Sequence, residues 1–126
     1  MKHRFLLLGA LLGATTCVSL SASSAITKEA VTAERMNTES AKANAFFDRV
    51  FDEDVDRSPL SQGYLGIKKD NDKWDDFSEA RELENLQRTV AQLAELRSTI
   101  YYEWLDEQTQ VSYRLFALQA DRTIEG

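Results

Sequence analysis

Apolar side chains recur at spacings of three and four residues along much of this 126-residue chain, which is the period of an amphipathic α-helix. Alternating runs of β-branched residues are absent, and Pro59 is the only proline. The pattern therefore predicts an all-α protein. We expect four helices, at about 28–51, from Pro59 to about Leu65, at about 77–100, and from about 107 onward.

The predicted helix at 77–100 has the strongest signals. Asp76-Phe77-Ser78-Glu79 fits an acidic version of the capping box that begins many helices. Glu84 and Arg88 are spaced for an ion pair on its surface. The residues expected to form its buried face, with Ala80 and Leu96 beside them, are Leu83, Leu86, Val90, Leu93, Arg97 and Ile100.

The last helix is predicted to begin near Asp106 and to lie antiparallel to the one before it, because the connection is short. Its expected shared face is Val111, Leu115, Leu118 and Arg122, with Tyr113 and Phe116 at the flanks. Tyr101, Tyr102 and Trp104 fall in the bend, where they either pack at the helix corner or form a partner-binding patch. We expect the two helices to form a hairpin or small bundle.

The first two helices have local start and stop signals. Thr27 is the expected N-cap of a helix over Lys28 to Phe51. Ser58 and Pro59 suit the start of the short helix, and Gly66 suits its end in the left-handed conformation. The apolar positions expected on the faces of these helices are Ala33, Met36, Ala43, Phe46, Phe47 and Val50 in the first, and Leu60, Tyr64 and Leu65 in the second.

Residues 1–25 have the pattern of a secretory signal peptide. Basic residues at 2–4 precede the apolar run Phe5 to Leu12, and Ser23-Ser24-Ala25 supplies small residues for cleavage after Ala25. The apolar run is shorter than the roughly 20 residues that a spanning helix needs. We expect export to the periplasm or the medium. A retained membrane anchor and a lipid on Cys17 are the alternatives, although Ala14-Thr15-Thr16 is a poor lipidation signal.

Cleavage after Ala25 would remove the only histidine, His3, and the only cysteine, Cys17. Residues 26–126, one small domain at most, would keep 13 basic and 21 acidic residues, a net charge of −8. That charge argues against nucleic acid and anionic membranes as partners. Without imidazole or thiolate, this part lacks the usual zinc ligands and nucleophile–base pairs. We therefore predict no catalytic, cofactor-binding or metal-binding residue.

Two acidic stretches resemble sites only superficially. Asp52, Asp54 and Asp56 alternate as in an EF-hand loop, but Arg57 and Gly63 stand where glycine and glutamate are required. A loop starting at Asp70 fails in the same way, with Asp75 and Arg81 at those positions. Solvated acidic loops are expected instead.

Asp75 and Asp76, next to Trp74, suggest an acid/base pair near an aromatic side chain. Adjacent acids before a predicted helix are more typical of helix caps, and we expect that role here.

The segments DRSPLSQGYLGIKKDNDKWDD (Asp56–Asp76) and LDEQTQVSYRLFALQADRTIE (Leu105–Glu125) resemble the N-terminal part of a bacterial family of exported proteins, the DUF885 family. The resemblance covers about residues 44–126. Members of this family are longer helical proteins that look like zinc metallopeptidases with an HExxH motif far downstream. This chain has no position that matches that motif. The resemblance implies that residues 26–126 are an incomplete N-terminal segment of such a domain, so that the predicted hairpin or small bundle is part of a larger helical fold.

Two functions follow as hypotheses. The chain is either a truncated piece of a metallopeptidase-like protein, inactive by itself, or a complete small exported helical protein that binds a partner through its aromatic and leucine faces. Its partner would be the missing C-terminal portion or another protein, and self-association is expected if apolar faces stay exposed.

Overall fold

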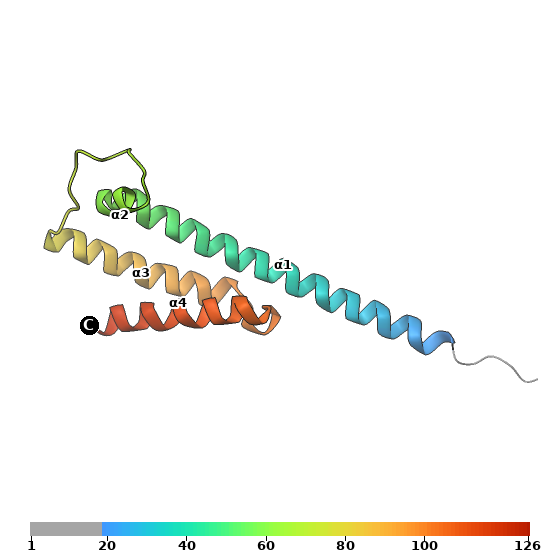
Figure 1. The fold of residues 1–126 in the computed structure, drawn as a ribbon. Coiled ribbons are helices and arrows are strands. Elements are labelled where there is room, and N and C mark those ends of the chain that lie inside the picture. The colour runs from blue at the N-terminus through green and yellow to red at the C-terminus, as the bar shows by residue number, and fades with distance from the viewer. Residues whose placement is uncertain (1–18) are drawn as a thin grey trace, which may run out of the picture.

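The computed structural model describes residues 19–126, and side-chain surroundings from residue 28 onward (Figure 1). The described part is all-α, as predicted, and contains no strand. Its elements are α1 (Ser19–Arg57), α2 (Pro59–Tyr64), α3 (Glu79–Thr99), the 3₁₀ helix η1 (Tyr102–Trp104) and α4 (Glu107–Glu125). His3, Cys17 and most of the expected signal peptide lie outside the described residues.

α1 is a long rod whose C-terminal half packs against the other helices, while its N-terminal half extends beyond them (Figure 1). The predicted start at Thr27 is wrong, because the chain is already helical at Ser19. The predicted end at Phe51 is also too early. The last turns stay helical because Val55 is buried and Arg57 pairs with Glu84 of α3. Ala33, in the extended half, is exposed rather than part of a core.

The core lies where α1, α3 and α4 meet. Phe46 of α1 packs edge-on against Phe116 of α4, with ring centroids 5.4 Å apart. Phe47 lies 5.8 Å from the same ring. The buried residues of this cluster are Ala43, Phe46, Val50, Leu96, Ile100 and Leu105. Burial of these apolar side chains is the main force that joins the three helices.

α3 and α4 form the antiparallel pair that the short connection predicts (Figure 1). Their N-caps are local: the Ser78 hydroxyl accepts a hydrogen bond from Arg81 N, and the Asp106 carboxylate accepts one from Thr109 N. α3 therefore begins at Glu79, two residues later than expected. Ser78 is its cap rather than Asp76.

The buried face of α3 is only partly the predicted one. Leu93 and Ile100 are buried, but Leu83 and Val90 are exposed, as is Arg97, which pairs with Asp121 of α4. The predicted Glu84–Arg88 pair does not form; both residues pair with α1 instead. α3 packs against both α1 and α4, so its buried residues are those that face both helices, with Leu96 among them.

The expected core face of α4 is wrong, because Val111, Leu115 and Leu118 point to solvent. The opposite face packs on the bundle. Tyr113 meets Tyr102, and Phe116 meets the two phenylalanines of α1. Small residues on that side, Ala117 and the buried Ala120, allow close approach of the neighbouring helices.

No helix within residues 19–126 has an apolar stretch long enough to cross a bilayer.

Replacing Leu93 by Asp should lower the melting temperature far more than replacing Glu84 by Ala. Leu93 is buried, so the change removes apolar packing and buries an unpaired carboxylate, at a cost of about 3 kcal/mol or more. Glu84 is exposed, and its ion pairs with Arg57 and Arg81 are screened by water. Circular dichroism during heating measures both shifts, and equal shifts would contradict the core described above.

Candidate functional site

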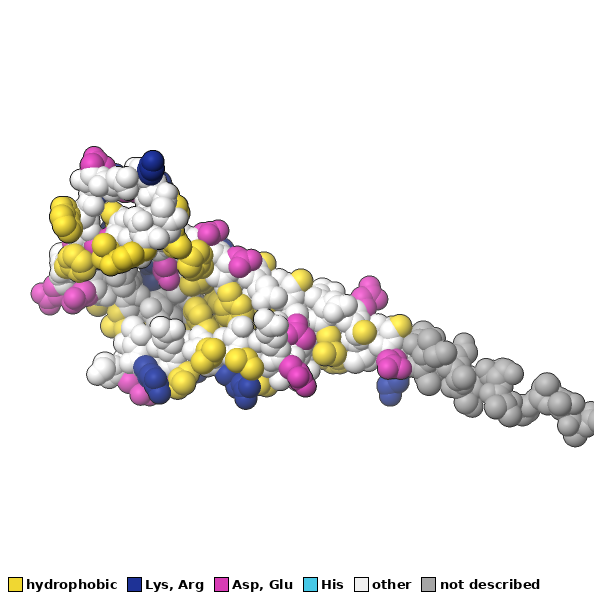
Figure 2. All heavy atoms as spheres, viewed as in Figure 1, with side chains coloured by type: hydrophobic (Ala, Val, Ile, Leu, Met, Phe, Trp, Pro, Cys, Tyr) yellow, Lys and Arg dark blue, Asp and Glu magenta, His cyan; other side chains and the backbone are white. Residues whose placement is uncertain are grey.

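The candidate site is a surface formed by α2 and the loop at residues 65–78. Leu60, Tyr64, Trp74 and Phe77 expose large apolar side chains there, and we call these four residues the aromatic surface. Tyr64 is 84% exposed and Trp74 is 89% exposed. The four residues line a groove of about 550 Å³. Figure 2 shows hydrophobic side chains gathered at this end of the molecule.

α2 is held in place by its own caps and by one buried glutamine. The Ser58 hydroxyl accepts a hydrogen bond from Ser61 N, and Pro59 occupies the first turn, both as predicted. Gly66 adopts a left-handed φ of 76°, also as predicted. The buried Gln62 donates from Nε2 to the Val55 carbonyl at 3.1 Å and to Asp70 Oδ2 at 3.1 Å. α2 and the loop are thereby tied to the end of α1.

Asp75 closes the loop by binding back to the start of α2. One carboxylate oxygen accepts from Leu60 N at 2.8 Å, and the other accepts from the Ser58 hydroxyl at 2.7 Å. The expectation that Asp75 caps the helix that follows is therefore wrong; it supports the helix that precedes it. This long-range connection positions Trp74 and Phe77 beside α2.

Asp76 does not act together with Asp75. Its carboxylate accepts from Ser78 N at 3.0 Å and lies 3.7 Å from Arg81 Nε. The Ser78 backbone N–H lowers the pKa of the Asp76 carboxyl below its ordinary value. A carboxyl with a lowered pKa is a poor proton donor near neutral pH. Asp76 therefore stabilises the start of α3 and does not form an acid/base pair with Asp75.

The other acidic stretch is helical rather than a solvated loop. Asp52, Asp54 and Asp56 all lie in the last turns of α1, where Asp54 pairs with Arg88 and Asp56 pairs with Lys69. Asp54 and Asp56 therefore contact different neighbours, and the three aspartates do not form a metal-binding group. Asp70 lies in the loop and pairs with Lys73 at 2.7 Å.

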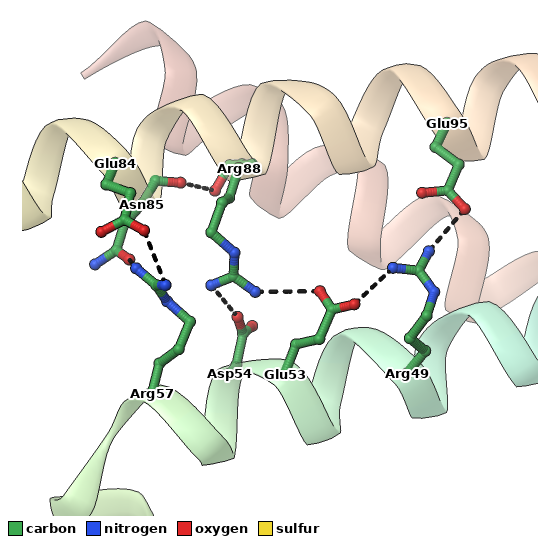
Figure 3. A network of polar contacts seen from close by, with 9 residues as sticks. Arg49, Glu53, Asp54, Arg57, Glu84, Asn85, Arg88 and Glu95 are labelled. Carbon is green, nitrogen blue, oxygen red and sulfur yellow. Dashed lines mark hydrogen bonds and ion pairs between the residues drawn. The ribbon is translucent and has the colours of Figure 1, made fainter.

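Charged residues between α1 and α3 form a network that the sequence reasoning missed (Figure 3). Glu53 accepts from Arg49 at 2.9 Å and from Arg88 at 3.2 Å. Arg49 also reaches Glu95 at 2.7 Å. Opposite charges at the end of α1 and along α3 are visible in the sequence. Their pairing depends on how the two helices pack, so spacing within one helix did not reveal it.

The aromatic bend packs on the body of the molecule. Tyr102 and Tyr113 are in edge contact with centroids 5.3 Å apart, and the Arg35 guanidinium lies 5.3 Å from the Trp104 ring. Tyr101 keeps an exposed ring, although its N–H donates to Glu39 Oε1 at 2.8 Å. Of the two readings of this bend, the structure favours packing at a helix corner for Tyr102 and Trp104.

Among the described residues, no group of three or more His, Cys, Asp or Glu side chains is placed to hold a metal ion.

Comparison with protein-family models found no match, and searches of curated proteins and of solved structures found none either. The resemblance to the DUF885 family therefore stays a prediction.

Acid should destabilise the fold. Hydrogen bonds from basic side chains lower the pKa of several carboxyls. The main ones run from Arg49 to Glu53, from Lys73 to Asp70 and from Arg57 to Glu84. A lowered folded-state pKa means that the unfolded chain binds protons more readily. The stabilisation is fully present above the ordinary carboxyl pKa of roughly 4, and it is lost as the pH falls through the folded values.

The urea concentration at the midpoint of unfolding should therefore decrease when the pH is lowered from about 6 to about 3. The decrease should be smaller in high salt, because these groups are exposed. A midpoint that stays constant over this range would show that the ion pairs contribute nothing to stability.

Asp75→Ala should loosen the aromatic surface without unfolding the bundle. The change removes the acceptor for Leu60 N and for the Ser58 hydroxyl, while the core of α1, α3 and α4 is untouched. Hydrogen exchange should accelerate at Leu60 and in the loop, but not in α4. Asp72→Ala is the matched control, since Asp72 is an exposed aspartate of the same loop with no hydrogen bond or ion pair among the described residues. Equal exchange in the two variants would contradict the role of Asp75.

Proposed function

We propose that residues 26–126 form the N-terminal helical wall of a larger exported protein of the DUF885 type, and that this chain alone catalyses no reaction. The observation that carries the proposal is the exposure of the aromatic surface. The rings of Tyr64 and Trp74 are exposed to water, although hydrogen bonds to Asp75 and from Gln62 fix the position of α2 and the loop. Contact with further protein would bury these rings and gain hydrophobic free energy.

The position of this surface supports the same proposal. The segment Asp56–Asp76, which carries the resemblance, corresponds to the end of α1, α2 and the loop. Tyr64 and Trp74, two of the aromatic residues in that resemblance, are also strongly exposed here. A residue that is buried in a full-length relative would be left exposed in this way when its neighbours are absent.

The absence of catalysis is proposed from the chemistry of the side chains. Asp70, Asp75 and Asp76 accept hydrogen bonds from Gln62, Ser58 and Ser78, respectively. The zinc chemistry of the resembled family requires imidazole ligands, and residues 26–126 contain neither histidine nor cysteine. Export is proposed from the signal-like residues 1–25.

A second candidate is a complete small exported protein that binds a separate partner. The groove beside Trp74 favours it, because Asp70, Asp72 and Asp75 outnumber Lys73 among the charged residues that line this apolar groove. Such a groove suits a partner segment that carries both apolar and basic side chains.

The two candidates are separated by translating the DNA beyond codon 126 in all three forward frames. The wall proposal expects a helical continuation that contains HExxH. Produced as a separate polypeptide, that continuation should bind this chain, with the affinity measured by titration calorimetry. Trp74→Ser should weaken the binding by about tenfold or more, as for a buried aromatic contact. Tyr101→Ser is the matched control, since Tyr101 is an exposed aromatic residue at the α3–α4 bend.

A stop codon followed by unrelated sequence would overturn the wall proposal and leave the second candidate. For the chain alone, incubation with a mixed peptide library and zinc should give no cleavage. Chelator-sensitive cleavage would contradict the proposal that the chain is not a catalyst.

A further inference from the structure

The outer face of α4 carries an exposed stripe that runs the length of the helix. Its members are Glu107, Val111, Leu115, Leu118 and Arg122, which we call the α4 stripe. Their spacings of three and four place them on one side of the helix. Val111 is 45% exposed, Leu115 is 61% exposed and Leu118 is 49% exposed. The buried residues of α4, Thr109 and Ala120, lie on the opposite side. Figure 2 shows hydrophobic side chains along the edge that α4 forms.

The charges at the two ends of the α4 stripe are opposite in sign and are not paired with other described residues. Glu107 begins the stripe and Arg122 ends it. Both side chains are exposed, and neither makes an ion pair or a hydrogen bond with another described residue. By contrast, Asp121, on the side that faces α3, is paired with Arg97. The stripe is therefore an apolar centre between an acid and a base.

We propose that the α4 stripe binds a second copy of the same stripe, with the two helices antiparallel about a two-fold axis that passes beside Leu115. Residue numbers that sum to about 229 then face one another. Val111 faces the partner's Leu118, and Leu115 faces the partner's Leu115. Glu107 faces the partner's Arg122, so symmetry creates two ion pairs.

The order of residues selects this arrangement. A parallel pair in register would place Glu107 against the partner's Glu107 and Arg122 against the partner's Arg122, which repel. Antiparallel helices also bring opposite ends of the helix dipoles together. An interface between two identical surface patches is self-complementary only under two-fold symmetry. The α4 stripe meets that requirement in both its apolar and its charged positions.

The expected dimer is weak. The 19 residues of α4 give a helix of about 28 Å, which buries less than the roughly 800 Å² per partner of a standard interface. Arg114 lies at the edge of the stripe near the axis, where it approaches the partner's Arg114. Both side chains are exposed and extend into water, so their repulsion is screened. We expect a dissociation constant on the order of one to a hundred micromolar.

The test is sedimentation of the full chain over a concentration series, with a charge swap. The wild-type chain should change from monomer to dimer as its concentration rises. Glu107→Arg should weaken the dimer by about tenfold, because each new arginine faces the partner's Arg122. Arg122→Glu should weaken it similarly. The double variant, with both charges exchanged, should restore the wild-type affinity.

Leu115→Asp places two carboxylates at the axis and should leave a monomer at every concentration. Val90→Asp is the matched control, because Val90 is also an exposed apolar residue but lies on α3, and the change should leave the dimer intact. Circular dichroism checks that each variant is folded.

A wild-type chain that stays monomeric up to about a millimolar, or a dimer that Leu115→Asp leaves unchanged, would overturn the proposal. Failure of the double variant to recover affinity would also overturn it, because the antiparallel register requires that recovery. Association through the apolar residues 5–12 cannot produce such a recovery. The aromatic surface plays no part in the proposed dimer, so this result and the test of the wall proposal are independent.

Discussion

The contact between Phe46 and Phe116 organises this molecule. It joins the C-terminal half of the longest helix to the last helix, and Leu96 of α3 and Ile100 at its C-terminal end complete the same cluster. Without this cluster, α1 would be a long rod with no apolar partner, and α3 and α4 would form an isolated hairpin. With it, the C-terminal half of α1 lies along α3. The distances needed for the charged network, such as 3.2 Å from Arg88 to Glu53, follow from that placement.

Local signals allowed the sequence to predict helix ends well in several places. Ser58, Pro59, Gly66 and Asp106 act through atoms within a few residues of themselves, so neighbouring sequence is sufficient to assign them. The start of α1 was missed because Thr27 has the chemistry of a cap but the helix passes through it. A capping residue marks a helix start only where the preceding chain leaves the helical conformation.

The face of α4 could not be chosen from periodicity. Val111, Leu115 and Leu118 form an apolar side, but Tyr113, Phe116, Ala117 and Ala120 form another. The aromatic side is buried because its rings fit between Phe46, Phe47 and Tyr102. The candidate site was hidden for a related reason. Asp75 acts on Leu60, 15 residues earlier, and no spacing rule for a single helix connects them.

A helix that is apolar on two sides has one face to build its own fold and another to meet a further surface. α4 is such a helix, and the aromatic surface beside α2 is a second, separate apolar region of a strongly acidic chain. The two regions differ in chemistry. The aromatic surface is irregular, is held by loop hydrogen bonds and is bordered by three acids and one lysine, which suits a partner with a different sequence. The α4 stripe is regular and carries one charge of each sign, which is what an identical partner requires. Their separate positions allow both contacts to form at once, because neither surface covers the other.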